Sequence, residues 1–168
     1  MKSGTQTFTL HSSDIGGQST KQQEFNGSNC DGENKSPQLS WTNAPAGTKS
    51  FALVMHDPDA PTNGGFYHWV AFNIPHSVTS LGTDAGNTDG KSMPEGSTMS
   101  LNSFGLNGYS GPCPPAGHGA HLYLYTIYAL DTEKLDLDKD AQPALVEFTL
   151  WQHIIERASI VSYYEVKE

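Results

Sequence analysis

The stretch that decides the fold runs Cys113-Pro-Pro-Ala-Gly-His-Gly-Ala-His-Leu-Tyr123 and continues as Leu-Tyr-Thr-Ile-Tyr-Ala-Leu130. Its first half is rich in Pro and Gly, which predicts a loop of defined shape. Its second half is β-branched and aromatic without a breaker, which predicts a long buried strand over 120–130. On a strand His121 and Tyr123 share one face, so an imidazole and a phenol enter the sheet together. This is a usual setting for a small polar-ligand pocket; the alternative is an edge histidine beside ordinary core aromatics.

The composition predicts a single mainly β domain over 1–168. Charged residues make up only 16% of the chain, while Gly (17) and Pro (10) are plentiful, as in short strands joined by turns. The net charge is −9 and no basic cluster occurs, which argues against binding to nucleic acid or to an anionic membrane surface. No apolar run approaches the roughly 18 residues of a membrane span, so we expect a soluble protein.

Alternation and turn signals predict an antiparallel β-sandwich with one helix near the C-terminus. The 50–56 run lacks alternation and should be buried on both faces. Within 66–74, simple alternation places His68 on the face of Val70, Phe72 and Ile74. The weakly patterned 75–111 segment should be functional or wrap the surface. The predicted strands are 5–12, 22–26, 39–42, 50–56, 66–74, 120–130 and 160–166, and the predicted amphipathic helix is 141–157, with Asp140 as its N-cap and Pro143 in its first turn.

Titratable residues gather where three predicted strands begin or end. Asp57 and Asp59 follow the 50–56 strand, in a turn that Pro58 and Pro61 stiffen. One aspartate that accepts a hydrogen bond from a histidine would fix the tautomer of that imidazole. A histidine pair, His68 and His121, could then hold a small anion together with the Tyr123 hydroxyl. The alternative is that the aspartates cap a turn and His68 is a satisfied core histidine.

Three motifs, Asp57-Pro-Asp-Ala-Pro61, Tyr67-His68-Trp69 and Pro114-Pro-Ala-Gly117 leading to His121-Leu-Tyr123, resemble the phosphatidylethanolamine-binding proteins. These are also called Raf kinase inhibitor protein-like, and the resemblance is to the bacterial YbhB/YbcL-type branch. It covers about residues 8–166. It implies a two-sheet β fold with a pocket for phosphate, acetate or phosphorylated amines such as phosphorylethanolamine. By motif the pocket would be lined by Asp57, Pro61, His68, Pro114, His121 and Tyr123, with Asp59 supporting the turn.

Two positions near the pocket motif depart from the family pattern. The residue after the pocket histidine is usually basic in the family, whereas this chain has Leu122. Strand alternation puts Leu122 on the face opposite His121, so the anion site should survive while the outer contact is lost. His118 is an addition in the loop, from which it could reach the rim of the pocket.

The two cysteines, Cys30 and Cys113, form either one disulfide or two free thiols. The resemblance favours the disulfide, because some bacterial members link these loops. A disulfide implies a periplasmic or exported protein, and free thiols a cytoplasmic one. Residues 1–15 contain no apolar leader core; whether a leader was removed is left open.

The resemblance favours a non-enzymatic binding or regulatory protein, since family members regulate kinases or inhibit proteases. No cofactor is expected. The protein partner and the oligomeric state are left open, although a homodimer is common among bacterial relatives. Against catalysis, no serine or cysteine in the expected pocket stands beside a base. One alternative is a metal-dependent hydrolase using His118, His121 and His68, with Asp57 or Cys113 as a further ligand. Another is a partner-binding domain whose pocket is vestigial.

Overall fold

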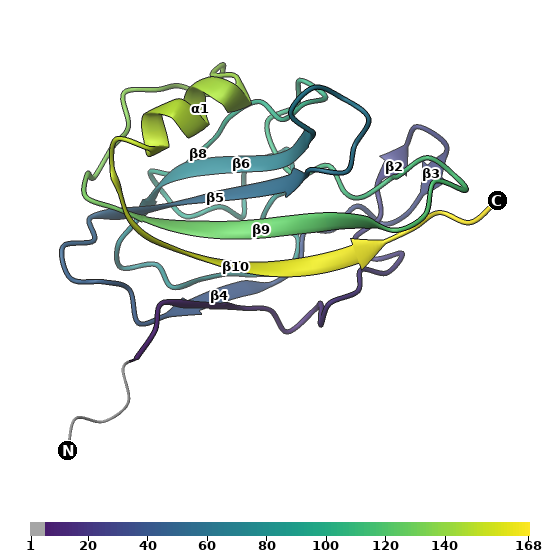
Figure 1. Ribbon diagram of the computed structural model, residues 1–168. Coiled ribbons are helices and arrows are strands. Elements are labelled where there is room, and N and C mark those ends of the chain that lie inside the picture. Colours follow the sequence, from purple (N-terminus) through teal and green to yellow (C-terminus); the bar gives the residue numbers. More distant parts are fainter. Residues whose placement is uncertain (1–5) are drawn as a thin grey trace.

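The centre of the molecule is a five-stranded antiparallel sheet, shown in Figure 1. The computed structural model describes residues 6–168. The strand order is β10-β9-β5-β6-β8. The central strand β5 is buried on both faces apart from half-buried His56, as its unbroken apolar run predicts. The strands are β5 (Ser50–Asp57), β6 (Phe66–Pro75), β8 (Thr98–Met99), β9 (His121–Leu130) and β10 (Ile154–Tyr164).

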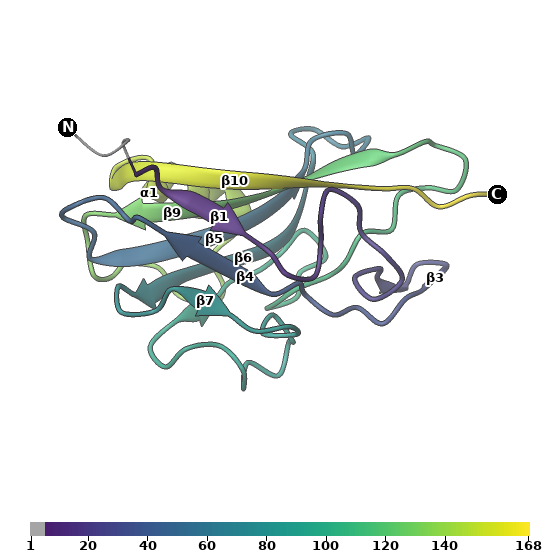
Figure 2. The ribbon, with the colours of Figure 1, turned by 90° about the horizontal axis from the view of Figure 1, so that it is seen from below.

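A smaller sheet and a helix cover the two faces of the central sheet (Figures 1 and 2). The small sheet has the order β1-β4-β7 and consists of β1 (Thr9–His11), β4 (Leu39–Thr42) and β7 (Ser80–Leu81). The helix α1 (Pro143–Leu150) lies on the opposite face, and a separate hairpin is formed by β2 (Asn26–Gly27) and β3 (Cys30–Asp31). The predicted antiparallel β-sandwich with a helix near the C-terminus is confirmed.

Each face of β5 anchors its own hydrophobic core. Between the sheets, Trp41 of β4 packs edge-on against Phe51 of β5 with ring centroids 5.4 Å apart. On the other face, Val146 and Leu150 of α1 pack with Val54 of β5. Burial of each such side chain contributes about 1.5–3 kcal/mol. Removing either the small sheet or α1 would therefore expose the β5 side chains on one face of the central sheet.

The helix is shorter than the apolar spacing predicts. The predicted helix 141–157 is wrong at its C-terminal end, because α1 ends at Leu150. From Ile154 the chain runs antiparallel to β9 as part of β10. The β-branched pair Ile154 and Ile155 suits a strand, and hydrogen bonding to β9 outweighs the helical period. The helix buries Pro143, Val146 and Leu150, whereas the apolar side chains of Phe148 and Trp151 are 66% and 68% exposed.

Several other boundaries differ from prediction. Asp140 does not cap α1; the N-cap is Gln142, which makes no side-chain capping hydrogen bond, while Pro143 lies in the first turn as expected. β1 begins only at Thr9, and residue 5 of the predicted strand lies outside the described residues. The predicted edge strand 22–26 coincides with a strand only at Asn26, the first residue of β2, because residues 22–24 turn the chain. Strand β10 begins at 154 instead of 160. The 75–111 segment contributes the short strands β7 and β8.

A β-bulge sets the direction of His68. Met55 of β5 pairs with Trp69, and the next residue, His56, pairs with Tyr67. His68 is therefore an extra residue with no partner on β5, which shifts the alternation of β6 by one position. The prediction that His68 shares a face with Val70 is wrong: Val70 packs in the core under α1, whereas His68 faces the end of the other core, beside Tyr123.

A disulfide joins Cys30 of β3 to Cys113, across 83 residues of sequence. Of the two possibilities that the sequence leaves open, a disulfide or two free thiols, the structure has the disulfide. The bond fastens the β2–β3 hairpin to the loop that leads into Pro114. Across residues 6–168, no helix has both the length and the apolarity needed to cross a membrane.

We predict that removing the disulfide lowers the free energy of unfolding by about 2–4 kcal/mol, because the unfolded chain loses a long covalent loop. For a domain of this size the melting temperature should fall by about 5–15 °C. Differential scanning calorimetry of the parent and of the Cys30→Ser/Cys113→Ser variant measures the shift. Reductant should lower the melting temperature of the parent but not of the variant. An equal melting temperature for both proteins would contradict the prediction.

Candidate functional site

A cavity of about 140 Å³ opens where β5 ends and where β6 and β9 begin. Because these three strands are neighbours in the antiparallel sheet, the end of β5 lies beside the starts of the other two, as Figure 1 shows. The structure brings all six predicted ligand-binding residues to this cavity. They are Asp57, Pro61, His68, Pro114, His121 and Tyr123; their role in binding stays a prediction.

A buried hydrogen bond between Asp57 and His121 joins the end of β5 to the start of β9. Asp57 Oδ2 lies 2.7 Å from His121 Nδ1, and both side chains are at most 4% exposed. Because an ionised carboxylate only accepts, His121 Nδ1 carries the hydrogen. The other carboxylate oxygen of Asp57 accepts the backbone N–H of Asp59 at 2.8 Å. The aspartate thus holds both its own turn and the imidazole, as the sequence suggests for one aspartate of the pair.

His118 and Asp59 complete the support around His121. His118 Nδ1 lies 2.6 Å from His121 Nε2, so both ring nitrogens of His121 have a protein partner. His118 itself is exposed and does not line the cavity. Asp59 Oδ2 accepts the backbone N–H of Leu122 at 2.8 Å, which ties the 57–61 turn to β9. The Leu122 side chain does not line the cavity, as expected from its position on the opposite face.

His68 presents a neutral imidazole. Its Nδ1 lies 2.6 Å from the carbonyl oxygen of Ser110, and because a carbonyl only accepts, Nδ1 donates and Nε2 bears the lone pair. Burial lowers the pKa of His68 to about 4, although the Ser110 carbonyl and the Asp57 carboxylate act in the opposite direction. At neutral pH His68 therefore carries no charge, so it cannot attract an anion as a cationic histidine would.

The remaining walls come from residues that sequence reasoning did not single out. Phe66, at the start of β6, packs on His68 at 4.9 Å between ring centroids. Phe104, from the 75–111 segment, packs on Phe66 at 4.7 Å. Phe66 lies two residues before His68, so the sequence did hold a signal for it. Phe104 is 36 positions away from His68 in a segment without periodicity, and no local pattern marks it. The other additional lining residues are Ala60, Thr62 and Cys113.

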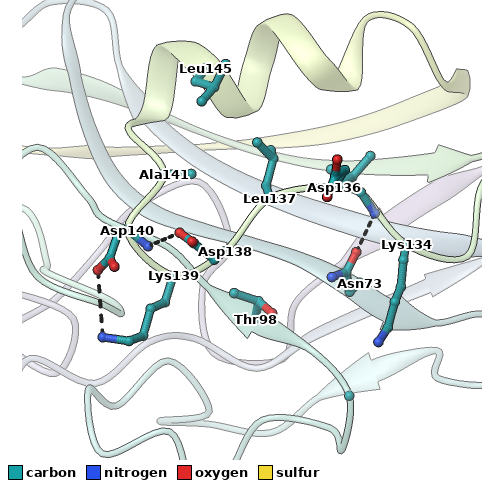
Figure 3. Close-up of a pocket in the computed structure, with 12 residues that line it drawn as sticks. Asn73, Thr98, Lys134, Asp136, Leu137, Asp138, Lys139, Asp140, Ala141 and Leu145 are labelled. Atoms are coloured by element: carbon teal, nitrogen blue, oxygen red, sulfur yellow. Dashed lines mark hydrogen bonds and ion pairs between the residues drawn. The ribbon is translucent and has the colours of Figure 1, made fainter.

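A larger groove of about 870 Å³ lies between α1, the 134–141 segment and β8, and is drawn in Figure 3. Its charged side chains are of both signs and are exposed, and Lys139 pairs with Asp140 at 3.7 Å. Asn73, the buried polar residue in its wall, accepts the backbone N–H of Leu135 through its Oδ1 at 2.8 Å. The groove is thus a solvated surface with no convergent polar groups, and the smaller cavity is the better candidate site.

Comparisons with known proteins agree with the motifs. The family model of the phosphatidylethanolamine-binding protein matches residues 4–165. The UPF0098 protein YbcL of Escherichia coli is 44% identical over 162 residues, which are 95% of this chain and 88% of that protein. The UPF0098 protein YbhB of the same organism is 42% identical over 140 residues, which are 83% of this chain and 87% of that protein.

Solved structures give the same result. The crystal structure of E. coli YbcL, described as a member of the mammalian PEBP family, superposes with a TM-score of 0.93 and covers 95% of this chain and 99% of that chain. A PEBP homologue from Chlamydia trachomatis, CT736, is 29% identical with a TM-score of 0.78, and covers 94% of this chain and 97% of that chain. The sequence motifs, the sandwich and these matches lead to one conclusion: the chain belongs to the phosphatidylethanolamine-binding protein family.

Proposed function

We propose that this chain is a non-enzymatic binding protein that holds the phosphate or carboxylate group of a small, phosphorylethanolamine-like molecule in the cavity at the end of β5. The observation that carries the proposal is the buried Asp57–His121 pair beside the Tyr123 hydroxyl. A phenol donor in a low-dielectric site is well suited to an oxyanion, and the Asp57–His121 pair holds the wall beside it. Membership of the family supports a binding or regulatory role in general.

The size of the cavity limits the ligand. At about 30 Å³ for each water molecule, 140 Å³ corresponds to four or five waters, enough for one tetrahedral or carboxylate group. The apolar rim formed by Phe66 and Phe104 suits a short carbon substituent on that group. A kinase, a protease or a second copy of the chain would have to dock outside this cavity, with at most one small group inserted into it.

Two features support binding rather than turnover. The sulfur atom at the cavity, that of Cys113, is committed to the disulfide, so it is neither a nucleophile nor a metal ligand. In residues 6–168, no three or more His, Cys, Asp or Glu side chains are grouped so that they could hold a metal ion. His118 and His121 instead face each other through their ring nitrogens. The metal-dependent hydrolase is therefore the less favoured alternative.

The disulfide also bears on where the protein works. Cysteine pairs such as Cys30 and Cys113 persist in oxidising compartments. One relative, the lipoprotein LppC of Mycobacterium tuberculosis, is 44% identical over 60% of this chain and 46% of its own length. Both observations support a periplasmic or exported location, which we include in the proposal.

We predict saturable binding of inorganic phosphate, acetate and phosphorylethanolamine by the parent protein in isothermal titration calorimetry. Binding should be lost in His121→Ala, because the buried Asp57 carboxylate is then left unpaired beside the anion. It should weaken at least tenfold in Asp57→Asn, because the amide no longer orients and supports the His121 imidazole. Both variants should melt cooperatively, which circular dichroism checks.

The matched control is His76→Ala, which removes an exposed histidine outside the cavity and should bind like the parent. If no anion gives heat with a folded parent, or if His121→Ala binds as well as His76→Ala does, the proposed function is wrong.

We predict that His118→Ala tightens anion binding about two- to tenfold. A ligand that bonds to His121 Nε2 must displace His118 from that atom, and a net hydrogen bond is worth about 0.5–1.5 kcal/mol. Calorimetry with phosphorylethanolamine measures the ratio of dissociation constants. A loss of affinity as large as that of His121→Ala would instead make His118 a ligand donor.

A further inference from the structure

Most polar atoms at the cavity already have protein partners. The two oxygens of Asp57 accept from Asp59 and His121. The two ring nitrogens of His121 contact Asp57 and His118. Among the described side chains that line the cavity, two polar atoms have no hydrogen-bond partner and can receive a ligand: Nε2 of His68 and the hydroxyl oxygen of Tyr123. Whether each group donates or accepts a hydrogen bond determines which ligands the cavity can bind.

The two groups offer one acceptor and one donor. His68 gives its Nδ1 hydrogen to the Ser110 carbonyl, which leaves Nε2 as a lone pair. The Tyr123 side chain is fully buried, packs on His68 at 5.3 Å between ring centroids, and its hydroxyl makes no hydrogen bond among the described residues. Burial raises the pKa of Tyr123 well above its ordinary value, so the hydroxyl keeps its hydrogen and donates.

The charges around the cavity also favour a protonated ligand. No Lys or Arg lines it, whereas the carboxylate of Asp57 does. A doubly charged oxyanion would bring its charge next to that carboxylate at low dielectric. It would also leave the His68 lone pair facing an oxygen lone pair, which costs free energy in a buried site. A proton on the ligand lowers the first penalty, because it halves the charge, and removes the second.

Building on the proposed function, we propose that the cavity selects a phosphate monoester in its singly protonated form. The P–OH of a phosphate monoester donates to Nε2 of His68, and another of its oxygens accepts from the Tyr123 hydroxyl. The site then discriminates a phosphate monoester from a sulfate monoester of the same shape and charge, because the sulfate has no proton to donate. His68 is the residue that determines this specificity.

The test compares methyl phosphate with methyl sulfate by calorimetry at about pH 5.5. There the phosphate monoester, with a second pKa of about 6, is mainly a monoanion like methyl sulfate, while His68 with its pKa of about 4 is neutral. We expect methyl phosphate to bind at least about tenfold more tightly, the cost of one unpaired buried acceptor.

Two variants assign the selectivity to a residue. His68→Gln should bring the ratio of the two affinities close to one, because an amide can turn either its oxygen or its NH₂ group to the ligand. Tyr123→Phe should weaken both ligands by a similar factor and leave the ratio unchanged, since the hydroxyl serves both. Thermal melts of both variants check their folding. If His68→Gln does not fold, the ratio of the two affinities measured for the parent protein alone tests the inference.

Failure of this inference differs from failure of the proposed function. If both ligands bind the parent equally, or methyl sulfate binds more tightly, the cavity is an anion site without selection for a proton, and the inference is overturned alone. If neither ligand binds a folded parent, the proposed function is overturned with it.

Discussion

The hydrogen bond between Asp57 and His121 is the constraint on which the architecture of the site depends. It joins the last residue of β5 to the first residue of β9 inside the core, with both side chains almost fully buried. Breaking one partner of such a buried pair typically costs about 3–5 kcal/mol. Asp59 adds a second tie from the same turn to β9 through the N–H of Leu122. The cavity is therefore rigid because the strand ends that form it are bonded to each other, and a rigid site loses little entropy when a ligand binds.

Across the cavity His68 has the opposite character. Its imidazole is held by a backbone carbonyl instead of a carboxylate, and burial keeps it neutral. One wall therefore has an imidazole whose two nitrogens are bonded within the protein, and the other wall has an imidazole that acts as an acceptor. Two histidines that look equivalent in the sequence perform different tasks because one faces Asp57 and the other faces Ser110.

The sequence was sufficient for the sandwich, for the buried β5 strand and for the set of residues at the cavity, because these follow from local patterns and from motifs. It was not sufficient where long-range pairing decides. The bulge at His68 depends on its register with β5, and the early end of α1 depends on the pairing of Ile154 with Leu130. The contact of His68 with Ser110 spans 42 positions, so no local pattern indicates that this histidine is neutral. The pairing of the two cysteines was suggested by family resemblance alone.

The selectivity of the cavity depends on the protonation state of His68, which nitrogen NMR of the imidazole rings tests most directly. Long-range ¹H–¹⁵N correlation spectra, with His68 assigned through the His68→Gln variant, distinguish the two neutral tautomers and the cation. We predict that His68 carries its hydrogen on Nδ1 between about pH 5.5 and 7.5, since its pKa is about 4. A His68 signal that titrates near the ordinary histidine pKa of about 6.5, or that shows the hydrogen on Nε2, would contradict the account.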